Sequence, residues 1–228
     1  MKILVTGGAG FIGSHLCDEL LNKANSVVVV DNLSLGKIDN IKHLTGEVSF
    51  KFYREDLLNY KKIVKIFRNE QPDIVFHMAA NSDIASSIKN PEIDLNNTYL
   101  STFNVLNVMR ELGISKLFFA SSSAIYGDTF SNLTENFGPL LPISHYGAGK
   151  LASEAFISSF SACYDIQSWI VRFPNVVGER ATHGVIYDFI NKLKSNPGKL
   201  EVLGDGEQYK PYLCLLYTSD AADEEDSV

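Results

Sequence analysis

The chain has 228 residues, 45% hydrophobic and 21% charged, a composition that suits a globular protein and excludes wholesale disorder. Five acids in residues 213–228 contribute much of the net charge of −7. The remainder, with 20 bases against 22 acids, offers no basic stripe for nucleic acid or an anionic membrane. Three widely spaced cysteines and the lack of a long apolar run predict no disulfide framework, no metal site and no membrane span, so we expect a cytoplasmic protein.

Short apolar runs alternate with longer helical patterns from the first residues onward, which favours a strand rather than a signal peptide at the start. Strands are expected at 3–5, 27–30, 48–52, 74–76, 117–119 and 169–171. Helices are expected at 11–24, 58–70, 91–112 and 145–164. This repetition predicts an α/β fold of the Rossmann type, in which helices cover both faces of a doubly wound parallel sheet.

The pattern changes after Gly178, where a loop precedes a helix expected near 183–195 and a turn at Gly204-Asp205-Gly206. We therefore expect a main domain over residues 1–178 and only the start of a smaller C-terminal lobe over residues 179–212.

A glycine-rich loop, Thr6-Gly7-Gly8-Ala9-Gly10-Phe11-Ile12-Gly13, follows the first strand directly. Glycines there remove the Cβ atoms that would block a pyrophosphate, and the next helix offers free N–H groups and the positive end of its dipole. An ordinary glycine turn is the alternative. The place between strand and helix favours a dinucleotide site made by Gly7, Gly10, Phe11, Ile12 and Gly13.

The second predicted strand ends in Asp31, 18 residues beyond Gly13. A carboxylate at this place accepts the ribose hydroxyls of NAD and repels the 2′-phosphate of NADP. Lys37 is the only base close behind it. A solvated acid at a strand end is the alternative, but the combination with the glycine loop predicts NAD as the cofactor.

Tyr146 and Lys150 lie four residues apart at the start of a predicted helix, so that phenol and ammonium share one face. A tyrosine with a pKa of about 10 is a poor base at neutral pH, and a nearby cation is expected to lower that pKa. The pair would then serve as a general base. The alternative is a solvated helix face, on which such pairs are common.

The strand at 117–119 leads into Ser121-Ser122-Ser123 at its carboxyl end, the edge at which open α/β sheets bind ligands. A hydroxyl there can hydrogen-bond the reacting oxygen of a substrate, although three serines can also form a simple polar exit from a strand. Asp56 and Asn97 would face the same cleft, whereas His77 is interpreted as a packed, structural histidine.

Assembled in chain order, these motifs resemble the extended short-chain dehydrogenase/reductase family, and within it the nucleotide-sugar epimerases of the UDP-glucose 4-epimerase type. The resemblance extends from residue 1 to about residue 212. It is carried by the glycine loop, Asp31-Asn32, Glu55-Asp56-Leu57, His77-Met78-Ala79-Ala80, Asn97, the segments 121–127 and 146–150, and Arg172-Phe173-Pro174-Asn175.

The resemblance implies a role for each matching residue. Ser122, Tyr146 and Lys150 would be catalytic. Besides the glycine loop, Asp31, Tyr146 and Lys150, the residues that would contact the cofactor are Asn32, Asp56, Leu57, Ala79, Ala80, Asn97 and Phe173. Ser122, Asn175 and Lys210 would contact the nucleotide-sugar substrate.

The resemblance also implies a reaction, in which the C4 hydroxyl gives its proton to the tyrosine and its hydride to tightly held NAD. The 4-keto sugar then rotates in the site, and the proton and the hydride return to its opposite face. Dehydratases of the family carry an acid just after the catalytic hydroxyl, whereas here Ser123 and Ala124 follow, so C4 epimerisation of a UDP-hexose or its N-acetylated relative is expected. A 4-keto reductase or dehydrogenase, a dehydratase and a non-catalytic NAD sensor remain alternatives.

Two residues depart from the family pattern. Val177 replaces a frequent tyrosine, and Lys210 replaces an arginine, offering a point charge where the guanidinium would give a bidentate fork. From residue 213 onward the sequence resembles the translation of a transposase adapter used in sequencing libraries. We therefore expect residues 213–228 to be non-native and the rest of the C-terminal lobe to be missing, which would leave this chain with little or no activity.

Members of this family often form homodimers through the helices that correspond to 91–112 and 145–164. The resemblance therefore implies a homodimer for the full-length protein, and the apolar positions Phe156, Ile157 and Phe160 would suit such a helical bundle.

Overall fold

A computed structural model describes residues 1–129, 133–202 and 211–215 of the chain. The chain divides into one unit from Met1 to Arg172 and a second unit from Phe173 onward. The predicted turn at Gly204-Asp205-Gly206 and the predicted substrate contact Lys210 lie outside the described residues. The predicted domain limits at residues 178 and 212 stay predictions.

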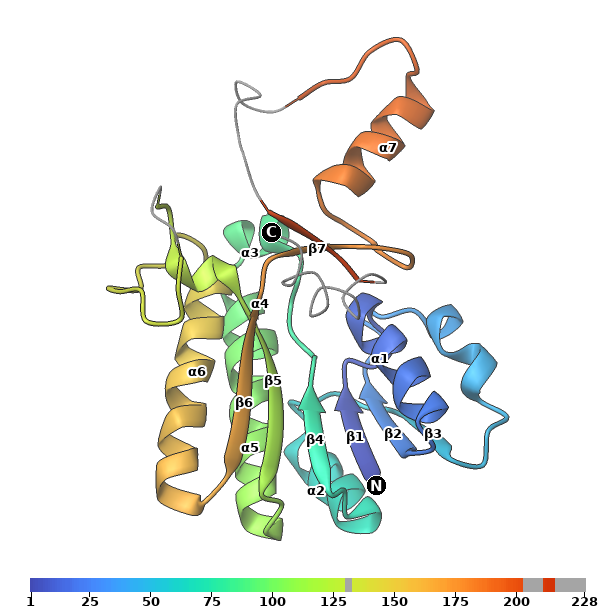
Figure 1. Ribbon diagram of the computed structural model, residues 1–228, viewed down its shortest axis with the longest axis vertical. Coiled ribbons are helices and arrows are strands. Elements are labelled where there is room, and N and C mark those ends of the chain that lie inside the picture. The colour runs from blue at the N-terminus through green and yellow to red at the C-terminus, as the bar shows by residue number, and fades with distance from the viewer. Residues whose placement is uncertain (130–132, 203–210, 216–228) are drawn as a thin grey trace, which may run out of the picture. The chain divides into compact units, whose positions relative to one another are not determined.

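The first unit is built on a six-stranded sheet with the strand order β3-β2-β1-β4-β5-β6, which Figure 1 shows from right to left. Its strands are β1 (Lys2–Thr6), β2 (Ser26–Asp31), β3 (Phe50–Arg54), β4 (Ile74–His77), β5 (Lys116–Ser122) and β6 (Gln167–Phe173). The pairings that join β3, β2, β1, β4 and β5 are parallel. This order is that of the dinucleotide-binding Rossmann fold, which confirms the predicted fold class.

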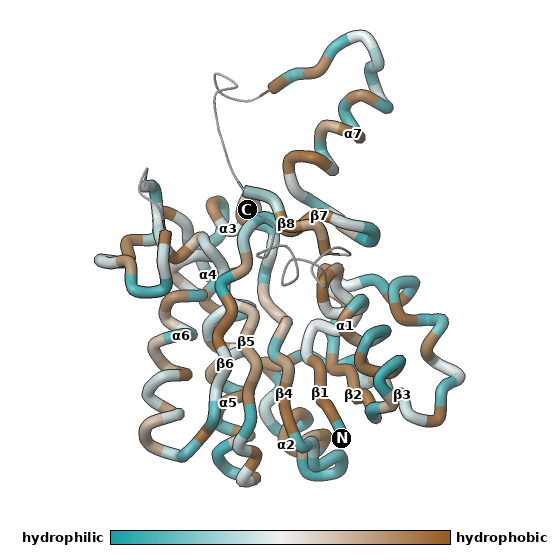
Figure 2. Tube along the Cα trace, in the orientation of Figure 1, coloured by the Kyte–Doolittle hydropathy of each residue, from teal (hydrophilic) through white to brown (hydrophobic). Residues whose placement is uncertain are grey.

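Residues along each central strand alternate between two apolar clusters, one on each face of the sheet. Leu4, Val28 and Val75 belong to a cluster that includes buried residues of α2 (Tyr60–Glu70), α5 (Ser101–Leu112) and α6 (His145–Tyr164). Ile3, Val5 and Val27 belong to the other, which includes Cys17 of α1 (Phe11–Asn22). Figure 2 shows β1, β2 and β4 largely in brown, the hydrophobic composition expected of strands buried on both faces.

The edge strand β6 is covered less completely. Ile170 packs against the cluster that contains α5 and α6, whereas its neighbours Trp169 and Val171 are 42% and 37% exposed. Because side chains of a strand alternate between faces, these two residues share the face opposite Ile170. That face of β6 therefore presents apolar surface to water.

Two expected elements differ in the structure. Val48 is fully exposed rather than in a strand, because the N–H of Phe50 bonds back to Glu47 in a turn and β3 begins only at Phe50. The helix expected over 91–112 runs without a gap from Glu92 to Leu112, but its winding changes along the way. It consists of α4 (Glu92–Asp94), a π-helical segment (Leu95–Leu100) and α5, preceded by a helix α3 (Ile84–Lys89) that the sequence pattern did not predict.

Short 3₁₀ helices complete the first unit. Two of them, Ile38–Asn40 and Lys42–Leu44, connect β2 to β3, and a third, Ser123–Tyr126, follows β5. Within the described ranges, no helix is both long and apolar enough to cross a membrane.

The second unit contains the expected helix as α7 (Val185–Ser195) and two short strands, β7 (Asn175–Val177) and β8 (Tyr212–Cys214). The two strands pair in parallel, with Val176 opposite Leu213. Leu213 and Cys214 are the first residues of the segment predicted to be non-native, and that origin stays a prediction.

Candidate active site

The glycine loop is held tightly against the ends of two strands. Gly7 has a φ of +69°, and a Cβ atom there would lie 2.7 Å from the backbone of Ala79, two residues after the end of β4. A Cβ atom on Gly13 would lie 2.2 Å from the carbonyl oxygen of Gly7. Only glycine fits at either place, so the loop can pass directly over the carboxyl ends of β1 and β4.

The start of α1 is left open for an anion. Its N-cap residue is Gly10, no side chain caps the helix, and its first turn contains no acid. The first N–H groups of a helix need partners, and the positive end of the helix dipole favours a negative one. The N–H groups of the first turn, at Phe11 and Ile12, therefore fit the pyrophosphate of a dinucleotide.

Asp31 lies beside this loop at the end of β2. Its carboxylate accepts the N–H of Ala9 at 3.0 Å and the N–H of Leu33 at 2.8 Å. Burial raises the pKa of Asp31, while the two N–H groups act in the opposite direction. Two bonds leave further lone pairs on the carboxylate, as binding of ribose hydroxyls requires.

The other predicted cofactor residues of the first unit lie around the same edge. The Asn32 amide donates to the Asp56 carboxylate at 2.8 Å, which joins the ends of β2 and β3. Ala79 contacts Gly7, and Ala80 is half-buried. Leu57 is buried in the apolar core, so its assignment to the cofactor stays a prediction. These residues together fit NAD.

The predicted catalytic residues meet where α6 approaches β5. The Ser122 oxygen accepts the N–H of Ala124 at 3.1 Å, and the Ser122 hydroxyl hydrogen-bonds Tyr146. Ser144 begins α6 by accepting the N–H of Gly147 at 3.0 Å. A Cβ atom on Gly147 would lie 2.5 Å from the Ala124 carbonyl oxygen, so glycine is needed for this approach. The serine and the tyrosine therefore come together as predicted.

Lys150 is fully buried behind the tyrosine. Its ammonium nitrogen donates to the Ala120 carbonyl oxygen at 2.6 Å and lies 4.7 Å from the ring centre of Phe119 and 5.8 Å from that of Tyr146. Burial lowers the pKa of Lys150 to about 7, although the charges of Asp94 and Glu154 act to raise it. Burial thus weakens the hold of this lysine on its proton.

The expectation that a neighbouring cation lowers the pKa of Tyr146 is wrong for this structure. Burial raises that pKa, the charge of Asp94 raises it further, and only the bond from Ser122 acts to lower it. Desolvation of the buried phenol is the main cause of this rise, and the same burial lowers the pKa of Lys150.

Two predicted positions on the cofactor side have different environments. His77 is buried between Thr6, 2.6 Å from its Nδ1, and Thr102, 2.9 Å from its Nε2. Burial lowers its pKa to about 3, which agrees with a structural histidine. Asn97 lies in the π-helical segment and is half-buried, and no hydrogen bond of its side chain is found among the described residues.

A polar network that the sequence did not predict binds Ser121, the residue before Ser122. Glu154 of α6 accepts from the Ser121 hydroxyl at 2.5 Å and from two nitrogens of Arg172, at 3.1 and 2.8 Å. Arg172 also donates to the Tyr126 hydroxyl at 2.9 Å. Glu154, four residues after Lys150, follows the helical spacing of the catalytic pair, which was its only signal in the sequence.

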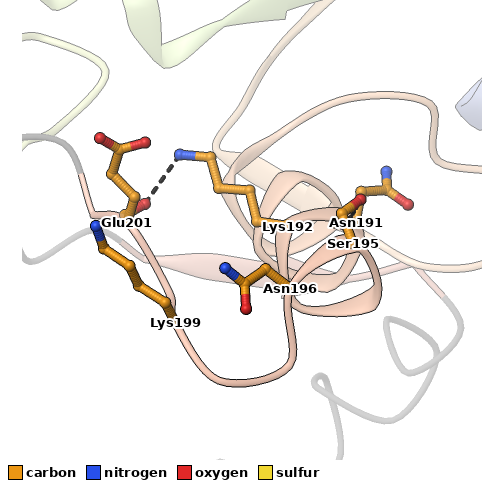
Figure 3. A pocket seen from close by; sticks show the side chains of 6 residues that line it. All are labelled: Asn191, Lys192, Ser195, Asn196, Lys199 and Glu201. Carbon is orange, nitrogen blue, oxygen red and sulfur yellow. Dashed lines mark hydrogen bonds between the residues drawn. The ribbon is translucent and has the colours of Figure 1, made fainter.

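The remaining predicted residues belong to the second unit. Phe173 is half-buried, and Asn175 is exposed and donates to the Pro211 carbonyl oxygen at 3.3 Å, so their ligand contacts stay predictions. Figure 3 shows a hollow at the end of α7, where the Lys192 ammonium donates to the Glu201 carbonyl oxygen at 2.9 Å. None of the predicted site residues lines this hollow.

The fold and the site define a dinucleotide-binding enzyme of the short-chain dehydrogenase/reductase class, with a serine, a tyrosine and a lysine beside the cofactor edge. Residues 3–223 match the NAD dependent epimerase/dehydratase family. The chain belongs to this family.

Similar proteins narrow the class further. The chain is 36% identical to a Methanocaldococcus jannaschii protein provisionally named a UDP-glucose 4-epimerase, over 96% of this chain and 70% of that protein. A solved UDP-galactose 4-epimerase is 42% identical, with a TM-score of 0.83 over 95% of this chain and 68% of the other. The Thermus thermophilus UDP-glucose 4-epimerase in complex with NAD is 32% identical, with a TM-score of 0.82 over 94% and 71%.

Proposed function

We propose that this protein is an NAD-dependent nucleotide-sugar epimerase that inverts C4 of a UDP-hexose or of its N-acetylated relative. The observation that carries the proposal is the meeting of Ser122 and Lys150 at Tyr146. Because the paired strands run parallel, the ends of β1, β2 and β5 place this group at the same edge as the glycine loop and Asp31. A proton-transfer group thus lies beside a dinucleotide site.

The residues divide the work of proton transfer. When bound, NAD supplies the hydride acceptor and donor. The Ser122 hydroxyl would bond the sugar oxygen, since its own oxygen is already oriented by the N–H of Ala124. Tyr146 would take the proton of the C4 hydroxyl and return it. Lys150, fixed by the Ala120 carbonyl, would favour the ionised phenol whenever its ammonium is charged.

The segment after Ser122 disfavours elimination of water. The 3₁₀ helix Ser123–Tyr126 has no acid in its first turn, so no carboxyl directly follows the catalytic hydroxyl. A 4-keto reductase or dehydrogenase has the same triad and differs in releasing its reduced cofactor after each turnover. An NAD sensor would have no use for the proton-transfer group.

Incubation with UDP-galactose or UDP-N-acetylgalactosamine tests the proposal. Formation of the C4 epimer without net release of NADH supports it, and its loss in Tyr146→Phe assigns the reaction to this site. Accumulation of free NADH would favour the dehydrogenase. Binding of NAD is measured separately by calorimetry, with a protein that includes the complete C-terminal lobe. If that protein binds NAD but converts neither sugar, the substrate proposal is refuted.

We also infer that the full-length protein forms a homodimer through α5 and α6. Of the three residues expected at such an interface, Ile157 and Phe160 are buried in the chain's own core, because they pack against α5. Phe156 is 38% exposed and contacts the rings of Tyr99 and Phe103. Light scattering tests this, since Phe156→Asp should give a monomer.

Two further proposals concern the rest of the chain. We place the protein in the reducing cytoplasm because its three cysteines are widely spaced and form no paired motif in the sequence. We also propose that residues 213–228 are foreign to the gene and that the chain is truncated, although the family match extends to residue 223 and Leu213 and Cys214 pair with β7. Sequencing of the source gene tests this, because an intact reading frame that encodes the same residues would refute it.

A further inference from the structure

Asp94 is a buried carboxylate with one unsatisfied oxygen. Its side chain is 1% exposed, and its Oδ1 accepts from Thr98 at 2.7 Å and from the Asn81 amide at 3.2 Å. Its Oδ2 has no hydrogen-bond partner in the described part of the chain. A buried anion of this kind is costly unless a positive charge compensates it.

The backbone around Asp94 is also unusual. Asp94 ends α4 and directly precedes the π-helical segment Leu95–Leu100, a conformation that occurs mostly as single turns within α-helices and frequently at functional sites. Hydroxyls bond the carbonyl oxygens of this segment. Thr102 donates to Thr98 at 2.7 Å and Ser153 of α6 donates to the same oxygen at 3.3 Å. The widened turn is therefore held in place from α5 and from α6.

This segment packs against α6 at the residue before Lys150. A Cβ atom on Gly149 would lie 3.1 Å from the Thr98 side chain and 3.4 Å from the Asp94 carbonyl oxygen. The same Thr98 side chain bonds the Asp94 carboxylate. Asp94 is thus fixed against the helix that carries both Tyr146 and Lys150.

The charged and titratable groups that face Lys150 come from three elements. Tyr146 and Glu154 lie on α6, Asp94 on α4 and His77 on β4, while β5 contributes the Ala120 carbonyl and the Phe119 ring. Glu154 is already paired with Arg172, and His77 is neutral near pH 7. No cation lies within 4 Å of Asp94 among the described residues. The negative charge of Asp94 is therefore not neutralised by an ion pair and is available to balance the positive charge of Lys150.

We propose that Asp94 is the buried counterion of Lys150, a positioning residue that keeps a proton on this lysine inside an apolar environment. The charge of Asp94 acts on both members of the catalytic pair, favouring protonated Lys150 and neutral Tyr146. It therefore opposes loss of the lysine proton in the resting site. The link to catalysis rests on the proposed epimerase function, whereas the claim about the lysine charge does not.

The test is a pH titration of the Lys150 side chain by NMR of the chain labelled with ¹³C at lysine Cε, with the signal assigned by its loss in Lys150→Arg. Asp94→Asn keeps an oxygen for Thr98 and removes the charge. It should lower the titration midpoint of Lys150 by about one to two pH units, as expected for charges several ångströms apart at an effective dielectric constant of about 20. Asp94→Glu keeps a carboxylate and should bring the Lys150 midpoint most of the way back to the wild-type value.

Glu92→Gln is the matched control, because it removes an exposed acid from the same short helix. It should move the midpoint by no more than about 0.2 pH unit, as a screened surface charge does. If Asp94→Asn does not fold, Asp94→Ser removes the same charge with a smaller side chain. An unchanged Lys150 midpoint in a folded Asp94 variant overturns the proposal, even if urea unfolding shows lost stability.

The activity readout is separate. In an active protein, Asp94→Asn should move the alkaline limb of kcat to lower pH in step with the Lys150 midpoint. If the wild-type lysine titrates as described but neither UDP-sugar is converted, the epimerase proposal fails and the counterion proposal stands.

Discussion

The Lys150 ammonium and the Ala120 carbonyl oxygen are 2.6 Å apart, and Ala120 stands two residues before Ser122 on β5. This bond ties α6 to the strand that carries the serine. The lysine therefore fixes the place of the tyrosine relative to Ser122 as well as acting through its charge. Substitutions at this junction are the most direct tests of the site.

Tyr146→Phe should lower epimerase turnover by about 10²- to 10⁴-fold, the range lost when a general acid–base group is removed. The phenyl ring keeps the packing, so NAD affinity should change less than about threefold. Tyr164→Phe, at an exposed position of the same helix, is the control and should keep full turnover. Coupled spectrophotometric assays and calorimetry measure the two quantities, and an active Tyr146→Phe variant would refute the assignment.

Gly147→Ala should impair both folding and turnover. The added methyl would lie 2.5 Å from the Ala124 carbonyl oxygen and push α6 away from the segment that follows Ser122. We expect a loss of about 1–3 kcal/mol in the free energy of unfolding, as for other overpacked sites. Gly46→Ala, where no atom lies within 4 Å, should leave urea unfolding nearly unchanged. Equal stabilities of the two variants would contradict the close approach of α6.

Asp31→Asn should weaken NAD binding by about 10- to 100-fold, because bonds to a charged acceptor contribute about 1.5–3 kcal/mol. The same change should weaken NADP binding less, since it removes the repulsion of the 2′-phosphate. Asp39→Asn removes an exposed acid whose ion pair within the described ranges is with Lys42, and this variant should bind NAD normally. Calorimetry measures the affinity of each variant for NAD and for NADP. An unaltered NAD affinity for Asp31→Asn would rule out a bond between Asp31 and the ribose.

His77 should make the protein acid-sensitive. Its pKa is about 3 in the folded state against 6.5 for a free side chain, so below pH 6.5 the unfolded chain binds a proton that the folded chain does not. Stability should therefore fall as pH drops from about 6.5 toward 3, by up to about 1.4 kcal/mol per pH unit from this residue. Urea unfolding between pH 4.5 and 7.5 measures the slope. His77→Gln should flatten it, and an identical slope in that variant would exclude His77 as the cause.

Trp169, the single tryptophan of the chain, reports on the open face of β6. At 42% exposure its fluorescence should be red-shifted and readily quenched by iodide, and unfolding in urea should change the emission wavelength little. A blue-shifted, quencher-resistant emission would mean that this face is covered in solution.

The fold and the NAD cofactor could be predicted from the sequence because both depend on local signals. The glycine loop, Asp31 and the apolar strands are recognisable over short windows, and the spacing of Tyr146 and Lys150 is helical. The π-helical segment after Asp94 left no such signal, and its contact with Gly149 of α6 joins residues far apart in the sequence. The pKa of Tyr146 was predicted in the wrong direction because a sequence shows a neighbouring charge but not its burial.

All contacts described for Ser122, Tyr146 and Lys150 lie before residue 173, whereas Phe173, Asn175 and Lys210, predicted to bind cofactor or sugar nucleotide, lie from residue 173 onward. The proton-transfer apparatus and most of the predicted sugar-nucleotide contacts are thus encoded in successive stretches of the gene. A single recombination event near codon 173 would join an unaltered proton-transfer group to a different substrate-binding segment. Exchange at this point should therefore alter the preferred sugar and leave the proton-transfer residues unchanged.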